Sequence, residues 1–290
     1  MSHVLVYAAA LADLHDSPSR LSPEVAQALS ADLPYARFGA FLADLGDFSP
    51  DPRRLVSREE RAPFVTLYHC GAPVGVGLRM IELVSQASMV SRSAGMALIA
   101  GYFSHLVLDR QLCRPLSELA LALAPPGGSE AKMCAELGRL AGLQLLSRRE
   151  GRAVLGWRGL RDHLRISKRR GLALRGVSQG LSLLVRTATH EVLGHAPSAA
   201  QLDTWAHGLD LWARAQASPL GRYSVKVEEE AGLRGKLWDR QGFDLERRYT
   251  EALGACRETT AFAGAFLRAG DFSREARDRF LEQLPEGSLL

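Results

Sequence analysis

The stretch Gly101-Tyr102-Phe103-Ser104-His105-Leu106-Val107-Leu108-Asp109 lies in an apolar segment that runs from about Met96 to Leu108. Such a segment predicts a buried helix, in which His105 and Asp109 leave the same face one turn apart. Burying an imidazole or a carboxylate without a partner is costly, so something must satisfy both. A metal ion would do so. A His–Asp hydrogen bond inside the helical core is the alternative.

The remainder of the chain also has a helical period. Apolar residues recur at three- and four-residue spacing in eight further segments: Val4–Leu14, Pro23–Ala31, Val74–Ser91, Ser129–Leu146, Leu181–Leu193, Ser198–Ala217, Leu245–Ala269 and Ser273–Leu284. Around the opening stretch the predicted helix spans Gly95–Arg110. Ser198, followed by Gln201, has the spacing of a capping box. No series of short alternating strands appears. The sequence therefore predicts an all-α, multi-helix protein.

Composition suits one globular domain. The chain has 290 residues, of which 47% are hydrophobic and 23% charged. We expect a single domain over 1–290, with the candidate metal ligands in 1–146, a basic connector at 147–170 and C-terminal helices at 171–290. The net charge of +4 permits an anionic ligand without requiring one. The arginine-rich stretch Arg148–Arg170 is typical of a solvated connector, with a surface facing phosphates or headgroups as the alternative.

Cysteine usage and hydropathy predict a cytoplasmic location. The four cysteines form no Cys-x-x-Cys pair and are interpreted as reduced thiols: Cys70, Cys113, Cys134 and Cys256. No segment has the roughly 18 to 20 uninterrupted apolar residues of a membrane span. The apolar run Val4–Leu14 lacks the positively charged flank of a signal peptide and is predicted to be the first helix.

Histidines and carboxylates gather in the first 110 residues. One histidine opens the first predicted helix, an aspartate ends the segment Phe38–Asp44, and a second histidine begins the next helical region. With the two residues of the opening stretch, the candidate ligands are His3, Asp44, His69, His105 and Asp109.

This order resembles the zinc-dependent phospholipase C family, all-helical metal hydrolases that also include secreted single-strand nucleases. The likeness is closest to a poorly characterised bacterial branch, with an early helical His, a Gly-x-x-x-Pro-Asp turn, a lone His and then Gly-Tyr-x-Ser-His-x-x-x-Asp. Gly101–Asp109 matches the last of these, and Phe38–Asp44 matches the turn with Ala43 in place of proline. The likeness covers the N-terminal half, to about Leu146.

The resemblance implies up to three zinc ions in a cleft between helices. Asp44, His69, His105 and Asp109 would hold the central ion, with Asp109 bridging to a neighbour and His3 serving a second ion. Asp44 and Asp109 would thereby be catalytic. The implied reaction is hydrolysis of a phosphodiester or phospholipid headgroup bond by metal-activated water. The implied partner is an anionic, phosphate-containing small molecule or a lipid headgroup, whereas nucleic acid is not indicated.

Two departures from the family pattern affect the ligand set. A His-Pro follows the bridging aspartate in the family, whereas this chain has Leu112-Cys113-Arg114-Pro115, where the Cys113 thiolate would be a competent substitute. The family's later His-x-x-x-Glu falls on 130–136. There, either Lys132 and Glu136 or, in a shifted register, Glu130 and Cys134 occupy the two places.

These departures lead to two functional hypotheses. We expect one zinc site, allow for a second ion beside His3, and expect a third to be lost. The first hypothesis is a zinc-dependent phosphoric-ester hydrolase. The second is a degenerate, non-catalytic family member that serves as a binding scaffold with a structural zinc or no metal, because each missing ion removes transition-state stabilisation.

Two other motifs are better explained as structural. In His190-Glu191-Val192-Leu193-Gly194-His195 the histidines are five residues apart, so they do not share a helix face, and the helix is expected to end at Gly194. The Gly-x-Ser-x-Gly match at Gly176–Gly180 needs a preceding strand that the helical pattern does not provide.

Overall fold

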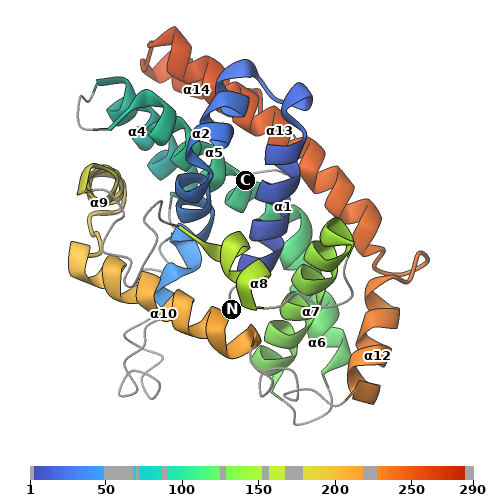
Figure 1. Ribbon diagram of the computed structural model, residues 1–290. Helices are drawn as coiled ribbons and strands as arrows, with labels where there is room; N and C mark the ends of the chain where they lie inside the picture. The colour runs from blue at the N-terminus through green and yellow to red at the C-terminus, as the bar shows by residue number, and fades with distance from the viewer. Residues whose placement is uncertain are drawn as a thin grey trace.

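The computed structural model describes residues 3–48, 68–69, 72–86, 90–124, 129–151, 157–166, 179–217 and 227–284. Within these ranges every regular element is a helix, which confirms the all-α class (Figure 1). The helices are α1 (Val4–Asp16), η1 (Pro18–Arg20), α2 (Pro23–Phe41), η2 (Leu42–Phe48), α4 (Pro73–Gln86), α5 (Arg92–Leu108), η4 (Asp109–Cys113), α6 (Arg114–Leu123), α7 (Glu130–Glu150), α8 (Trp157–Leu164), α9 (Gln179–Leu193), α10 (Ala199–Ala217), α12 (Val227–Leu237), α13 (Leu245–Ala269) and α14 (Arg274–Glu282).

Each of the nine helices predicted from periodicity has a counterpart in the structure. The capping box is also present, since the Ser198 backbone N–H donates to Gln201 Oε1 at 2.8 Å and the Gln201 N–H donates to Ser198 Oγ at 3.1 Å. Helix α9 ends at Leu193, and Gly194 follows in the left-handed conformation, as expected. Of the Gly-x-Ser-x-Gly match, positions 176–178 lie outside the described residues.

Two expectations need correction. Helix α2 continues past its predicted end at Ala31, through a kink at Asp32, as far as Phe41. The basic connector is not solvated throughout, because α8 lies within it and buries Leu160 and Leu164. Helices α6 and α12 were not predicted either. The remaining connector positions at 152–156 and 167–170 are outside the described residues.

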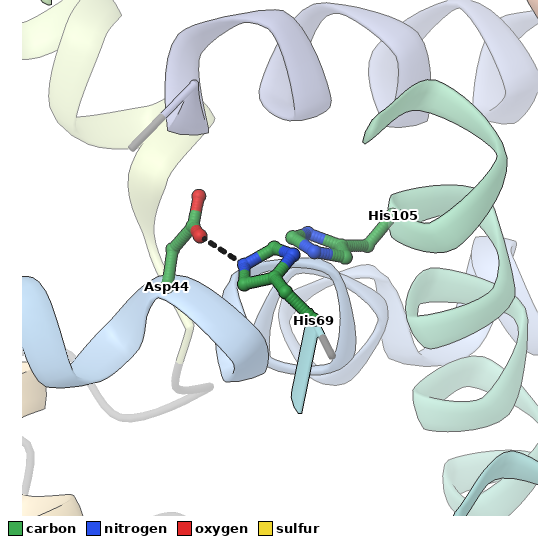
Figure 2. Close-up of side chains that lie close together, drawn as sticks. All are labelled: Asp44, His69 and His105. Atoms are coloured by element: carbon green, nitrogen blue, oxygen red, sulfur yellow. Dashed lines mark hydrogen bonds and ion pairs between the residues drawn. The ribbon is translucent and has the colours of Figure 1, made fainter. Parts of the chain in front are cut away.

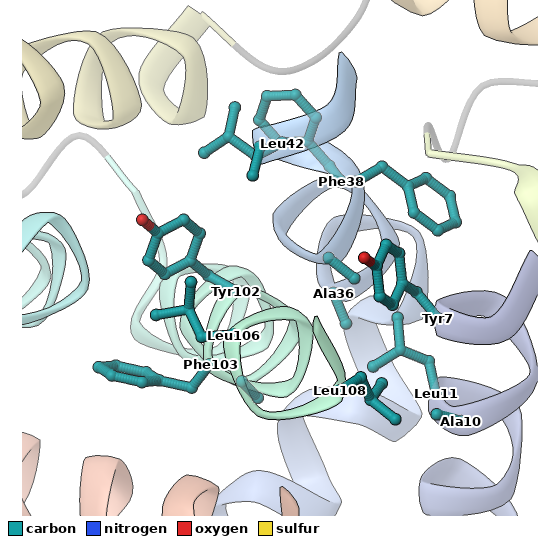
Figure 3. Packing of buried hydrophobic residues seen from close by; sticks show 14 of the residues in the cluster. Tyr7, Ala10, Leu11, Ala36, Phe38, Leu42, Tyr102, Phe103, Leu106 and Leu108 are labelled. Atoms are coloured by element: carbon teal, nitrogen blue, oxygen red, sulfur yellow. The ribbon is translucent and has the colours of Figure 1, made fainter. Parts of the chain in front are cut away.

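Helix α5 is the central element of the structure. It is buried from Ala94 to Leu108 and packs against α1, α2, α4 and α13. Figure 3 shows aromatic and aliphatic side chains of α5, among them Tyr102, Phe103 and Leu106, beside those of the surrounding helices. An all-round apolar helix of this kind explains why a polar residue on it faces protein and not water.

Helices α2 and α5 cross at backbone contact distance. A Cβ atom added to Gly101 would lie 1.8 Å from the Ala36 carbonyl oxygen, and one added to Gly39 would lie 2.0 Å from the Leu98 carbonyl oxygen. Neither position accepts a side chain unless the helices separate. This crossing brings the end of α2, and therefore Asp44 a few residues later, against the face of α5 that carries His105.

No helix in the described part of the chain is both long and apolar enough to cross a membrane.

Candidate metal centre

Asp44, His69 and His105 converge at the end of the α2–α5 crossing (Figure 2). They come from η2, from the short described segment 68–69, and from α5. Each contributes one ligand atom, and the three atoms lie within 4.8 Å of one another. Two imidazole nitrogens and one carboxylate oxygen are a donor set that zinc accepts.

His105 is held in one tautomer by the backbone of α2. Its Nδ1 lies 2.8 Å from the Ala40 carbonyl oxygen, which can only accept, so Nδ1 carries the proton. Nε2 therefore presents its lone pair, and within the described part of the chain this buried atom has no hydrogen-bond partner. The Tyr7 ring packs at 4.5 Å from the His105 ring and fixes its plane. Burial lowers the pKa of His105, which keeps the imidazole neutral.

Asp44 has one oxygen satisfied and one unsatisfied. Oδ1 lies 3.0 Å from His69 Nε2, whereas Oδ2 is buried and has no partner among the described residues. Burial opposes ionisation of this carboxyl, but the hydrogen bond with His69 and the charge of His69 outweigh it and hold the pKa well below its usual range. Asp44 is thus a buried carboxylate with a free lone-pair direction.

His69 lies between two carboxylates. Its Nε2 faces Asp44, and its Nδ1 lies 3.3 Å from Asp109 Oδ2. Burial alone would lower the pKa of His69, but the hydrogen bonds to Asp109 and Asp44 raise it to about 10. In the absence of a bound cation, this geometry therefore favours the imidazolium form.

Asp109 and Cys113 begin and end a π-helical turn, η4, between α5 and α6. The Asp109 side chain is 38% exposed and lies outside the set of three convergent ligands. Burial opposes its ionisation, but the hydrogen bond with His69 and the charge of His69 lower its pKa. Cys113 is buried beside Tyr7, and burial raises the pKa of its thiol well above the usual value. Short π-helical turns are frequent at functional sites.

His3 lies beside the centre at the start of α1. It is buried against Gly138 of α7, where an added Cβ would lie 2.4 Å from His3 Nδ1. That nitrogen has no hydrogen-bond partner in the described ranges. Burial lowers the pKa of His3 to about 4 although the nearby Asp44 and Asp109 act to raise it. A neutral imidazole is therefore available next to the three-residue set.

The structure does not bring the predicted Glu136 into this group. Its carboxylate pairs with Arg139 at 3.0 Å along α7. In the shifted register, Cys134 Sγ instead donates to the Ser117 carbonyl oxygen at 3.8 Å, and Glu130 is exposed in the first turn of α7. These interactions account for the α7 residues without a metal.

The residues present fit a zinc ion. Two ligands of one tetrahedral zinc lie roughly 3.4 Å apart, given bond lengths of about 2.0 to 2.1 Å. The 3.0 Å separation of Asp44 Oδ1 and His69 Nε2 approaches this value. A cation would also satisfy Asp44 Oδ2 or His105 Nε2, the buried atoms that no described group contacts.

The sequence singled out the residues that converge here, Asp44, His69 and His105, but not the groups that orient them. The Ala40 carbonyl and the Tyr7 ring hold His105, and η4 sets the direction of Asp109. Ala40 lies in the motif Phe38–Asp44, and Tyr7 lies in the first predicted helix. Neither motif indicates that these two residues orient His105. A backbone acceptor has no side-chain signature, so the sequence gives no direct signal for it.

Comparisons of the chain with protein-family models, with curated proteins and with solved structures found no match. The likeness to the zinc-dependent phospholipase C family therefore depends on the motif residues alone.

Proposed function

We propose that the chain binds zinc through Asp44, His69 and His105 and hydrolyses a phosphoric ester, either a phosphodiester or a phospholipid headgroup bond. The observation that carries the proposal is the convergence of three candidate ligand atoms within 4.8 Å of one another. Two of the three side chains, Asp44 and His105, also keep a buried atom that has no hydrogen-bond partner among the described residues. Two segments that resemble the phospholipase C pattern, Phe38–Asp44 and Gly101–Asp109, supply those two side chains.

The chain's own residues provide the framework for this reaction. When bound, zinc lowers the pKa of a water molecule and neutralises phosphate oxygens. Asp44 and the imidazole of His105, both buried, would hold the ion together with His69. His69 is 22% exposed and Asp109 38%, so a substrate reaches the centre from their side. His3, neutral and unpaired within the described chain, is available to a second ion or to a proton.

A groove lined in part by Arg110 and Gln111, which follow Asp109 in the chain, carries charges of both signs. The groove has a volume of about 720 Å³ and lies between η4–α6 and α13. Its charged lining residues are three arginines and three glutamates, namely Arg110, Arg114, Arg248, Glu118, Glu251 and Glu258. A long polyanion would meet the three carboxylates, whereas a headgroup with both charges finds partners of each sign.

Activity of the zinc-loaded protein tests the proposal. The protein is assayed for nitrophenol release from bis(4-nitrophenyl) phosphate and for headgroup release from phosphatidylcholine vesicles, with 4-nitrophenyl acetate as a carboxyl-ester control. We expect zinc-dependent turnover of a phosphoric ester, and no turnover by His105→Asn or after chelation. A zinc-loaded protein that hydrolyses none of these phosphoric esters would contradict the proposal.

One observation favours the second hypothesis, a non-catalytic binding scaffold. His69 contacts Asp44 and Asp109 at once, and a protonated imidazole donates a hydrogen bond to each carboxylate and offsets one of the two negative charges without an ion. In that case the protein would contain no zinc after purification without chelator, and added zinc would not raise its melting temperature. Metal content and thermal stability therefore identify a metal-free scaffold before any substrate is chosen, whereas a scaffold with a structural zinc differs from the hydrolase only in its lack of turnover.

A further inference from the structure

The two carboxylates that contact His69 cannot play the same role. An imidazole that binds a metal ion through one ring nitrogen carries a proton on the other, and that proton needs an acceptor. Asp44 lies at Nε2 and Asp109 at Nδ1, on opposite sides of the ring. One carboxylate is therefore a ligand together with His69, and the other accepts the hydrogen bond that orients the ring.

Three observations indicate which carboxylate is the ligand and which one orients the His69 ring. Asp44 belongs to the convergent set with His105, and Asp109 does not. Asp44 is buried and keeps one oxygen without a described partner, whereas the Asp109 side chain is 38% exposed. His105 is oriented in the same way that we infer for His69, because its Nδ1 donates to the Ala40 carbonyl and leaves Nε2 free.

We propose that Asp109 is a positioning residue that accepts the Nδ1 proton of His69 and thereby directs Nε2 toward the ion. The proposal rests on zinc binding at the proposed site, and it departs from the bridging-ligand role that the family resemblance implies for Asp109. Both imidazoles then use Nε2, and each Nδ1 is held by an oxygen of the chain. The orienting acceptor is the Ala40 carbonyl for His105 and the Asp109 carboxylate for His69.

A matched pair of substitutions distinguishes the two roles. Asn retains an oxygen that accepts a hydrogen bond but is a much poorer zinc ligand than a carboxylate. Zinc affinity is measured by titrating zinc(II) in competition with a chromophoric chelator. We expect Asp109→Asn to weaken binding by less than about tenfold and Asp109→Ala by about 10- to 100-fold, both with unchanged stoichiometry. Asp44→Asn should weaken binding by about 1,000-fold or more.

A spectroscopic measurement reports the His69 tautomer directly. Long-range ¹H–¹⁵N correlation of the zinc-loaded, ¹⁵N-labelled protein should show His69 protonated at Nδ1 and metal-bound at Nε2, and Asp109→Asn should keep that pattern. Circular dichroism of each variant establishes that it is folded. The half-exposed position of Asp109 makes its substitution tolerable, and the tautomer of the wild-type protein requires no variant.

Each outcome bears on a definite claim. If Asp109→Asn loses zinc as completely as Asp44→Asn, or if Nδ1 of His69 is metal-bound, Asp109 is a ligand and this inference is wrong, while the zinc site stands. If the wild-type protein binds no zinc, the proposed function is wrong and this inference is wrong with it.

Discussion

Asp13 and Asp44 are two carboxylates with opposite surroundings. Asp13 Oδ1 accepts a hydrogen bond from Arg149 at 2.8 Å, and its Oδ2 accepts one from the Tyr249 hydroxyl at 2.6 Å. Asp44 Oδ1 contacts His69, and its Oδ2 is buried without a partner in the described chain. Asp13 therefore has a hydrogen-bond donor for each of its oxygens. Asp44 instead lies beside imidazole nitrogens, and an unprotonated imidazole nitrogen is itself an acceptor.

The difference shows what separates a structural polar cluster from a candidate metal site. Arginine carries a permanent charge and several donors, so Arg149 joins α7 to α1 by satisfying Asp13 and Asp16 together. A neutral histidine with a fixed Nδ1 proton, such as His105, supplies a lone pair instead, and a buried set of inward lone pairs is the arrangement that a cation binds. Burial alone does not distinguish a structural polar cluster from a candidate metal site. The two are distinguished by the balance of hydrogen-bond donors and acceptors around the carboxylate.

The largest expected effect on folding stability follows from the helix crossing that supports the candidate metal centre. Gly101→Ala should lower the unfolding free energy by about 3 kcal/mol or more, because the new Cβ would lie 1.8 Å from the Ala36 carbonyl oxygen. Gly254→Ala on α13 is the matched control, since no atom lies within 4 Å of its added Cβ. It should stabilise the protein by about 0.5 to 1 kcal/mol. Denaturant unfolding measures both, and equal effects would contradict the close crossing.

His105→Asn tests the centre without removing its internal hydrogen bond. The Asn amide can replace Nδ1 as donor to the Ala40 carbonyl but provides no atom at the Nε2 position. Zinc affinity should fall by about 1,000-fold. The unfolding free energy measured with chelator should change by less than about 2 kcal/mol. Retained zinc affinity, measured by chelator competition, would remove His105 from the ligand set.

Asp13→Ala tests the structural cluster that Asp13 forms with Arg149 and Tyr249. The substitution removes the acceptor for Arg149 and Tyr249, so the unfolding free energy should fall by about 1 to 3 kcal/mol. Zinc affinity should not change, because neither partner of Asp13 belongs to the metal centre. Chemical denaturation and zinc titration of the same preparation give both values. A loss of zinc binding would mean that the two clusters are coupled.

The pH dependence of zinc binding is a smaller effect on zinc affinity than the substitution of His105. The carboxylates of Asp109 and Asp44 raise the pKa of His69 to about 10, so near neutral pH binding must release about one proton from this ring. Burial lowers the pKa of His3 to about 4 and lowers that of His105, so neither holds a proton to release. Apparent affinity should rise about tenfold per pH unit between about pH 6 and pH 8. Calorimetry in buffers of different ionisation enthalpy measures the number of protons released per zinc bound, which should be about one. A pH-independent affinity would contradict the His69 geometry.

Periodicity and residue spacing predicted much of this molecule, for identifiable reasons. The apolar run around Gly101–Asp109 predicted a buried helix, and the four-residue spacing placed His105 and Asp109 on one side of it. The continuation of α2 past the kink at Asp32 was missed because the packing of α2 on α5 outweighs a local break and Pro34. Local patterns predicted which helices form, but not these tertiary contacts.

In the candidate site, too, the sequence predicted residue types but not the tertiary contacts that orient them. The candidate ligand types were evident from the sequence, and Asp44, His69 and His105 do converge in the structure. The direction of each lone pair was not evident, because it is set by the Ala40 carbonyl and by the geometry of η4. Glu136 was predicted from register alone, and in the structure it contacts Arg139.

Elemental analysis of the untagged protein, purified without chelator and without added zinc, is the decisive measurement for the candidate metal site. We expect about one zinc per chain in the wild-type protein, with a further equivalent only if His3 serves a second ion, and none in His105→Asn. A wild-type protein that contains no zinc and takes up none on titration would contradict the metal centre and leave His69 as a structural link between Asp44 and Asp109.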